Sequence, residues 1–287
     1  MSPMARLSVV IPAHNEAVLI PMTLRAMLHG DVDERLEVVV VANGCTDDTV
    51  AAATAVSPRV RVIETDEASK IAALNAGDAV ADVFPRAYID ADVTVSCETL
   101  LALADVLGRD DLPRVAAPRL EVDTSTSSWA VRSFYAIWEL SEYRQQGHVG
   151  SGIYALSRSG RARWNAFPQV IADDRFVQQQ FELDERVTLT DRHFTVLAPA
   201  TMREHLRRSI RTQAGNRELP PDARRVAEAA AFERFGALGR RVLSRPRLWP
   251  AFAVYCFSFT VTRWKARRII RSGQSISWNR DDSTRGG

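Results

Sequence analysis

Two aspartates, Asp90 and Asp92, follow an apolar run at residues 84–89 and are separated by one residue. In an extended chain the side chains at i and i+2 point to the same side, so both carboxylates can reach one cation. Carboxylate oxygens are the ligands that hard divalent cations prefer. We therefore interpret the pair as a site for a hard divalent cation that would neutralise a diphosphate leaving group. The alternative is an acidic strand end that faces solvent.

Lysine is rare in this chain, because only 2 of its 37 basic residues, Lys70 and Lys265, are lysine. Lys70 stands at the start of a helix that we predict over residues 69–80. A helix N-terminus and a compact ammonium group both suit phosphate. Lys70 is thus a candidate phosphate ligand, and a solvated lysine in the first helical turn is the alternative.

A second acidic pair, Asp173 and Asp174, precedes a helix that we predict over residues 176–181. Adjacent side chains of a regular strand point to opposite sides, so only one of these carboxylates can face a site. We expect one to be structural, as a helix cap, and the other to act as a general base. A capping pair without catalytic function is the alternative.

Apolar and amphipathic segments alternate along the N-terminal half, which predicts a parallel sheet with helices on both faces. We predict strands at residues 7–11, 36–41, 60–63, 84–89 and 115–120, and helices at residues 18–29, 49–56, 69–80 and 98–107. Helical stretches follow at residues 128–144, 201–212 and 222–243. Open sheets of this class bind ligands at the carboxyl ends of their strands. Polar residues stand there, at positions 12–16, 43–44, 64–66 and 90–92.

The charge is divided unevenly along the 287 residues. Residues 1–200 carry 18 basic and 28 acidic side chains, a net charge of −10, whereas residues 201–287 carry 19 and 7, a net charge of +12. The basic C-terminal third is suited to an anionic partner. The segment at residues 245–271 places aromatic and aliphatic residues between arginines, a composition typical of a helix on an anionic membrane surface. A helix packed on the catalytic domain, with a solvated basic flank, is the alternative.

The three cysteines, Cys45, Cys97 and Cys256, show no spacing typical of a disulfide framework or a zinc site. The apolar segment near the N-terminus is too short for a signal peptide. We therefore expect a cytoplasmic protein, peripheral at the inner face of the membrane if the basic segment binds lipid.

Five stretches in this order resemble glycosyltransferase family 2, whose members adopt the GT-A fold: LSVVIPAHNEAVLIPMTL, VVVVANGCTDDTV, SKIAALNAG, AYIDADV and GSGIYALSRSGRARWNAFPQVIADDRFV. The likeness covers roughly residues 6–215. It implies a catalytic domain at residues 1–215, with a Rossmann-like, mostly parallel sheet, followed by a basic helical extension at residues 216–287.

The resemblance also implies roles for individual residues. Asp174 matches the catalytic aspartate of the family, and Asp90 and Asp92 match the pair that would hold Mn²⁺ or Mg²⁺. His205 lies where such enzymes often contribute a histidine to the metal, and a packing residue is the alternative. The predicted contacts with the nucleotide sugar come from Pro12, Ala13, Asn15, Glu16, Asn43, Lys70, Asp90, Ala91, Asp173 and Arg208.

This sequence departs from the family pattern at two points. Ala42 and Asn43 stand where many members carry two consecutive acids, which bears on uracil recognition. Asp173 replaces the glutamate that usually precedes the catalytic aspartate.

We expect an inverting glycosyltransferase that moves a sugar from a nucleotide diphosphate, with UDP the first choice, to the hydroxyl of a lipid-linked or small-molecule acceptor. One alternative is a nucleotidyltransferase, although residues 12–16 lack the glycine-rich loop of such enzymes. The other is a nucleotide-binding scaffold without turnover. No nucleic-acid-binding motif is present, so we expect no nucleic-acid partner.

Overall fold

The computed structural model describes residues 6–109, 112–141, 150–170, 172–215 and 236–271. The chain forms two compact units. The first comprises residues 1–121, 147–169 and 173–196, and the second comprises residues 122–146, 170–172 and 197–287. The predicted boundary between residues 215 and 216 therefore falls inside the second unit.

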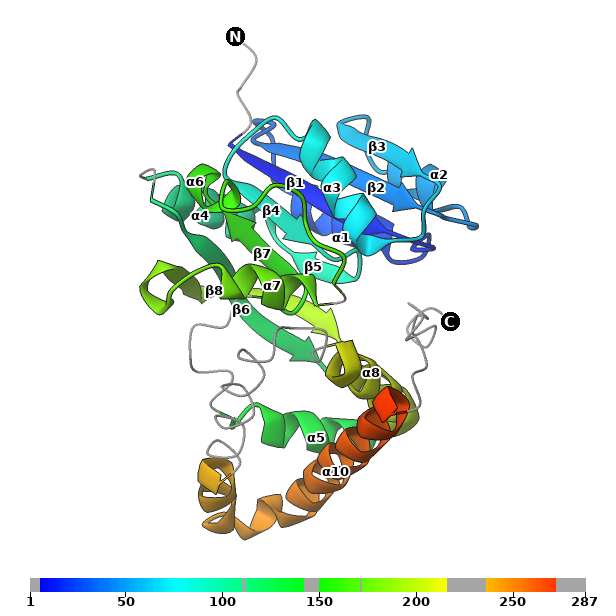
Figure 1. The fold of residues 1–287 in the computed structure, drawn as a ribbon, viewed down its shortest axis with the longest axis vertical. Coiled ribbons are helices and arrows are strands. Elements are labelled where there is room, and N and C mark those ends of the chain that lie inside the picture. The colour runs from blue at the N-terminus through cyan, green and yellow to red at the C-terminus, as the bar shows by residue number, and fades with distance from the viewer. Residues whose placement is uncertain (1–5, 110–111, 142–149, 171, 216–235, 272–287) are drawn as a thin grey trace. The chain divides into compact units, whose positions relative to one another are not determined.

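The first unit is built on a sheet with the strand order β3-β2-β1-β4-β7-β6-β8-β5 (Figure 1). Neighbours among β3, β2, β1 and β4 are parallel, whereas β7 is antiparallel to both β4 and β6, and β5 is antiparallel to β8. The strands are β1 (Leu7–Ala13), β2 (Leu36–Asn43), β3 (Val60–Thr65), β4 (Arg86–Ile89), β5 (Val93–Val95), β6 (Val115–Asp123), β7 (Ile153–Leu156) and β8 (Arg186–Leu197).

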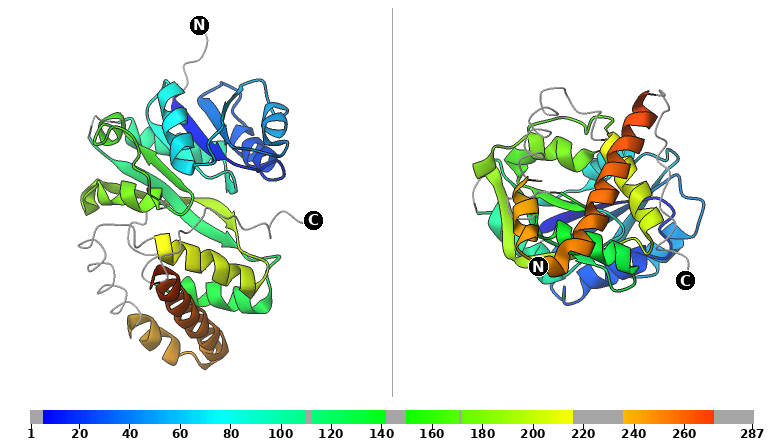
Figure 2. Two further views of the ribbon diagram at one scale, coloured as in Figure 1. Left: turned by 45° about the vertical axis from the view of Figure 1, so that its right-hand side comes forward. Right: turned by 90° about the horizontal axis from the view of Figure 1, so that it is seen from below.

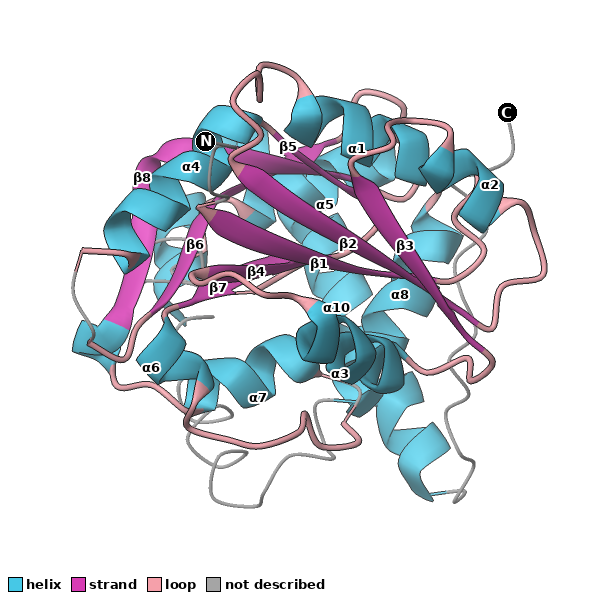
Figure 3. Cartoon of the chain, turned by 90° about the horizontal axis from the view of Figure 1, so that it is seen from above, coloured by secondary structure: helices cyan, strands magenta, loops and turns pink. Residues whose placement is uncertain are grey.

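Helices cover both faces of the parallel strands, which confirms the predicted α/β class. The helices α1 (Ile20–Leu28), α2 (Thr49–Thr54) and α4 (Cys97–Leu107) lie on one face, and α3 (Lys70–Val80) lies on the other (Figure 3). Two shorter helices, α6 (Arg158–Arg161) and α7 (Asp173–Gln179), and a 3₁₀ turn (Leu183–Glu185) complete this unit.

The strand order reverses its direction at β1, since β2 and β3 follow on one side of it and β4 lies on the other. Such a reversal leaves a crevice at the carboxyl ends of the two strands on either side of it, and open α/β sheets bind their ligands there. Residues that follow β1 and β4 are therefore brought to the same edge.

Local sequence specifies how these elements form. Every residue of β1 is buried, as expected for a continuous apolar run covered on both faces. The side chain of Ser69 accepts a hydrogen bond from the Ala72 N–H at the start of α3, and Ser96 does the same for Thr99 at α4. Each serine satisfies a backbone donor that the first turn of a helix leaves unpaired.

The second unit is helical, with α5 (Trp129–Trp138), α8 (Met202–Gly215), a helical segment at residues 236–243, a 3₁₀ turn (Pro246–Leu248) and α10 (Trp249–Arg271). The helix α10 packs against both α5 and α8 (Figure 2). Ile137, Leu238 and Val242 form a buried cluster beside the start of α10. The helix predicted at residues 201–212 is confirmed as α8, and that at residues 222–243 lies partly outside the described residues. Among the helices that the structure describes, none combines the length and the apolar composition needed to cross a membrane.

Gly77 allows α3 to lie close to the sheet. A Cβ atom at this position would lie 2.4 Å from Val10 Cγ1 and 3.0 Å from Val41 Cγ2, both on buried strands. We predict that Gly77→Ala lowers the free energy of unfolding by about 2 kcal/mol, the usual scale of overpacking, although alanine has the higher helix propensity. Chemical denaturation measures this change.

Gly239 offers a matched control, because a Cβ atom there meets no atom within 4 Å. Gly239→Ala should therefore stabilise its helix by up to about 1 kcal/mol. Equal effects at the two glycines would contradict the packing argument.

Candidate active site

The loop after β1 is tied to the loop after β2. His14 Nδ1 lies 2.6 Å from the Asn43 carbonyl oxygen, and Asn15 Oδ1 accepts a hydrogen bond of 2.7 Å from the Thr46 N–H. The Glu16 N–H donates to Thr49 Oγ1 at 2.7 Å, which joins the loop to the first turn of α2. Asn15 has a φ of +53°, a left-handed conformation that asparagine tolerates better than most residues. The backbone of this loop is thus fixed before any ligand binds.

The predicted contacts at the ends of β1 and β2 differ in how they are buried. Pro12 and Ala13 are the last two residues of β1 and are buried, and Glu16 is buried just beyond them. The side chain of Asn43 is fully buried, and neither its amide nitrogen nor its amide oxygen forms a hydrogen bond with a described residue. An unpaired buried amide costs free energy, so its retention here calls for an explanation such as a ligand or a water.

Lys70 bridges two carboxylates at the next strand end. Its Nζ lies 2.7 Å from Asp90 Oδ1 and 2.8 Å from Asp173 Oδ1. Burial alone would lower the pKa of Lys70, but the charges of Asp173 and Asp90 outweigh it and hold that pKa above its usual value. The ammonium group therefore stays charged and links α3, the end of β4 and the start of α7.

Asp90 and Asp92 lie at the turn between β4 and β5. The Asp90 N–H donates to the Gly152 carbonyl at 2.8 Å, and the carbonyl of Ala91 accepts from Thr23 Oγ1 at 2.8 Å. Loss of water around its carboxyl group raises the pKa of Asp90 to about 6, Lys70 opposes this shift, and Asp173 and Asp92 add to it. Asp92 itself is exposed.

The carboxylate oxygens of this turn are suitable ligands for a hard cation. Asp90 and Asp92 supply two carboxylates within three residues. The described residues contain no group of three or more His, Cys, Asp or Glu side chains suited to one ion. Any further ligands would have to come from elsewhere, such as diphosphate oxygens and water.

The acidic pair at the start of α7 divides into an inner and an outer carboxylate. Asp173 is 4% exposed and accepts hydrogen bonds from Lys70 and, at 3.2 Å, from the Tyr154 hydroxyl. It is the first residue of α7, and its carboxylate binds these two side chains. Asp174 is only half-buried, and its Oδ2 accepts from the Ser151 N–H at 3.1 Å.

Gly150 makes room for Asp174. Its φ is +122°, and a Cβ atom at this position would lie 2.9 Å from Asp174 Oδ2. Both the backbone conformation and the space therefore require glycine. The Asp174 carboxylate is fixed against this loop and by the Arg175 N–H at 2.7 Å.

Periodicity and spacing did not single out Tyr154 or Ser151. Tyr154 is buried on β7, and its ring stacks on Tyr88 with a centroid distance of 5.1 Å. In the sequence, a tyrosine within a short apolar run looks like an ordinary core residue. The hydrogen bond from its hydroxyl group to Asp173 therefore could not be inferred. The glycines on either side of Ser151 are the sequence feature that points to this loop, because glycine pairs of this kind mark unusual backbone angles.

His205 and Arg208 belong to α8, in the second unit. His205 is 3% exposed, and its Nε2 lies 3.1 Å from Ser258 Oγ. The centroid of its ring lies 4.0 Å from the centroid of the Phe134 ring. Burial lowers the pKa of His205 to about 4, and the charge of Arg208 acts in the same direction. The packing role is thus visible within this unit, and the metal and nucleotide roles of the two residues stay predictions.

A model of the family described as glycosyl transferase family 2 matches residues 8–165. Among solved structures, the chain is similar to the mannosyltransferase PcManGT from Pyrobaculum calidifontis in complex with GDP-Man and Mn²⁺, at 21% identity and a TM-score of 0.59 over 93% of this chain and 79% of that chain. It is also similar to S. aureus TarS 1-349 in complex with UDP-GlcNAc, at 18% identity and a TM-score of 0.51. That match covers 67% of this chain and 58% of the TarS chain, less than two thirds of its length. At these identities the likeness establishes the fold, which is GT-A. No curated protein matches the chain.

The buried state of His205 predicts how stability depends on pH. The folded protein holds a pKa of about 4 for this ring, whereas an unfolded histidine titrates near 6.5. The contribution of the neutral His205 ring to the free energy of unfolding is therefore complete above pH ~6.5. It falls by about 3 kcal/mol in total as the pH is lowered towards ~4.

His205→Gln cannot titrate in this range, so its free energy of unfolding should fall less than that of the wild type as the pH is lowered. Urea denaturation at a series of pH values measures the difference. Parallel curves for the two proteins would show that His205 is not held neutral by burial.

Proposed function

The chain belongs to glycosyl transferase family 2, and from this premise we propose that it transfers a sugar from a nucleoside diphosphate to an acceptor hydroxyl with inversion at the anomeric carbon. The observation that carries the proposal is the convergence of Lys70, Asp90 and Asp173 beside Asp174, at the edge of the sheet where ligands bind.

The nucleoside end of the donor is assigned to the loops that follow β1 and β2. The backbone of Asn15 and Glu16 is held in place there, and the buried amide of Asn43 lacks a partner among the described residues. An amide can both donate to and accept from a nucleobase. We assign UDP as the first nucleotide to test, and GDP as the second because PcManGT was crystallised with GDP-Man.

The diphosphate is assigned to the turn after β4. Asp90 and Asp92 would hold Mn²⁺ or Mg²⁺, which when bound neutralises charge on the departing diphosphate. Lys70 is held charged next to Asp90 and adds positive charge on the same side. Asp173, bound to Lys70 and Tyr154, orients this ammonium group.

Asp174 is the proposed general base, and its neighbour is unsuited to that role. A base must reach the proton that it removes. Asp173 is buried and bound to the Lys70 ammonium group and the Tyr154 hydroxyl, whereas Asp174 is half-buried and oriented by two backbone N–H groups.

The proposed transfer exchanges one bond of the anomeric carbon for another and moves one proton. The acceptor oxygen forms a bond to the anomeric carbon while the bond from that carbon to the diphosphate oxygen breaks. The acceptor proton goes to Asp174, and the nucleoside diphosphate leaves with the electron pair of the broken bond. Attack from the face opposite the leaving group inverts the configuration.

We predict that Asp174→Asn lowers turnover about a hundredfold or more, because asparagine keeps the size and one hydrogen-bonding oxygen but cannot accept the proton. Donor affinity and stability should change little. The measurement is transfer or donor hydrolysis, with the donor chosen by a screen of UDP-, GDP- and dTDP-sugars in Mn²⁺, and NMR of the product identifies the anomer.

Asp173→Asn is the matched control. It weakens a contact of Lys70, so it should affect donor affinity and stability more than Asp174→Asn does, and proton removal less. Near-normal turnover in Asp174→Asn would refute the base assignment. Inactivity of Asp173→Asn alone, with donor affinity retained, would show that Asp173 is the base.

A separate prediction concerns the metal. Asp92→Ala should weaken Mn²⁺-dependent binding of the nucleoside diphosphate about tenfold or more, since it removes one of two carboxylates. Calorimetric titration with and without Mn²⁺ measures this. Asp191→Ala, which removes an exposed carboxylate on β8, is the control. Equal Mn²⁺ dependence in Asp92→Ala and the wild type would exclude this metal site.

A further inference from the structure

The exposed face of α10 carries large aromatic side chains at helical spacing. Trp249, Phe257 and Trp264 are 53%, 58% and 58% exposed, respectively. Residues three or four apart share one face of a helix, and Ala253 and Thr260, also exposed, occupy the turns between the aromatics. The result is a stripe along the helix, which we call the aromatic stripe and define as Trp249, Ala253, Phe257, Thr260 and Trp264.

The opposite face of α10 is already occupied by its own unit. Ser258, Thr262 and Ala266 are buried on it. Tyr255 stacks on Phe134 of α5 with a centroid distance of 5.1 Å, and Ser258 contacts His205 of α8. The aromatic stripe is therefore not needed for the core of the unit, and it leaves apolar surface in contact with water.

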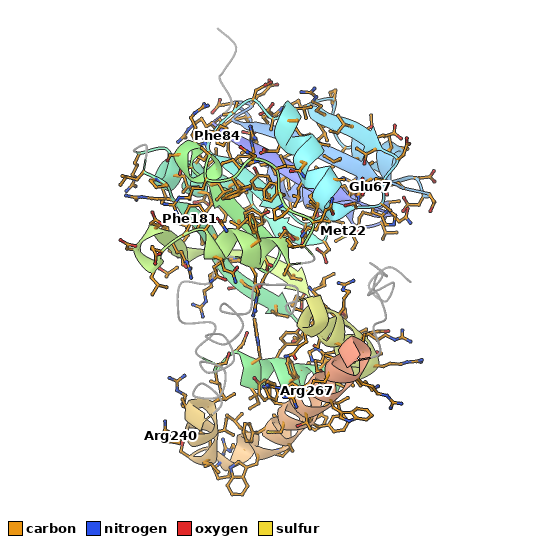
Figure 4. The ribbon with its side chains drawn as sticks, in the orientation of Figure 1. Met22, Glu67, Phe84, Phe181, Arg240 and Arg267 are labelled. Carbon is orange, nitrogen blue, oxygen red and sulfur yellow. The ribbon has the colours of Figure 1, made fainter. Side chains whose placement is uncertain are left out.

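Positive charge surrounds the aromatic stripe. The described segment 236–271 contains nine basic residues and no acidic residue. Lys265, Arg267 and Arg268 are exposed at the C-terminal end of α10, and the Arg268 guanidinium lies 5.7 Å from the centre of the Trp264 ring. Arg240 precedes the N-terminal end of the helix, so basic residues stand near both of its ends (Figure 4).

We propose that the aromatic stripe of α10, with its flanking basic residues, docks on the surface of an anionic lipid bilayer. Tryptophan prefers the headgroup level of a membrane, and arginine and lysine beside it meet the phosphates. The helix lies in the plane of the interface because its other face stays packed on α5 and α8.

A bilayer fits this surface better than a protein partner does. The aromatic side chains are separated by the small residues Ala253 and Thr260, so they form isolated anchors instead of the continuous apolar core typical of a protein interface. Each anchor can enter a fluid headgroup layer independently of the others. The uniform positive charge is complementary to a surface of uniform negative charge.

The test is sedimentation of the full-length protein with vesicles. We expect binding to vesicles of equimolar phosphatidylcholine and phosphatidylglycerol, little binding to phosphatidylcholine alone, and weaker binding as salt is raised. Arg267→Gln with Arg268→Gln should lower the partition coefficient about tenfold or more, from the usual contribution of a basic residue at an anionic surface. The exposed pair Arg25→Gln with Arg109→Gln, in the first unit, is the charge control.

A second pair of variants tests the aromatic side chains. Phe257→Ser with Trp264→Ser should also lower partitioning about tenfold or more, because it removes two apolar anchors without disturbing the buried face of α10. The control is Val32→Ser with Leu183→Ser, two apolar residues of the first unit that are 84% and 78% exposed.

The proposal is overturned if the protein does not bind anionic vesicles. It is also overturned if Phe257→Ser with Trp264→Ser partitions onto the vesicles as strongly as its control does. It is also overturned if analytical ultracentrifugation shows a dimer that Phe257→Ser with Trp264→Ser dissociates, because a second copy would then cover the stripe. None of these measurements depends on sugar transfer.

Discussion

The contact of Lys70 with both Asp90 and Asp173 is the interaction on which the candidate site depends. It joins three elements that are far apart in the sequence, namely the start of α3, the turn after β4 and the start of α7. Carboxylates brought this close repel one another unless a cation lies between them. The single lysine of the first unit supplies that cation.

The same contact separates the two acids of the adjacent pair. Lys70 and Tyr154 hold Asp173 inside, and Asp174 remains half-buried against Gly150 and Ser151. In the proposed reaction, one carboxylate acts on the electrostatics of the site, and its neighbour receives the proton of the acceptor. This division is possible because adjacent residues of a helix point in different directions.

The two faces of α10, in the second unit, lie in different surroundings. The inner face of α10 packs polar and small residues against α5 and α8, where His205 is kept neutral by burial. Its outer face keeps aromatic and basic side chains in solvent. From the sequence this helix combines packed and membrane-facing features. The contacts with α5 and α8 show the packing of its inner face, and the membrane interpretation of its outer face stays a proposal.

The sequence alone determined the strands β1 and β2, because each is a mostly apolar run that a buried parallel strand requires. The alternation of strands and helices also predicted β3, β4 and β6, and it placed Asp90 and Asp92 at the end of β4. The tertiary structure decided the rest. β5 and β7 have three and four residues and β8 carries several charges, so their pairing depends on neighbours far along the chain and leaves no local pattern. Lys70 and Asp173 are 103 residues apart, and only the fold could show that they meet, because periodicity describes which face a side chain occupies but not which distant group that face contacts.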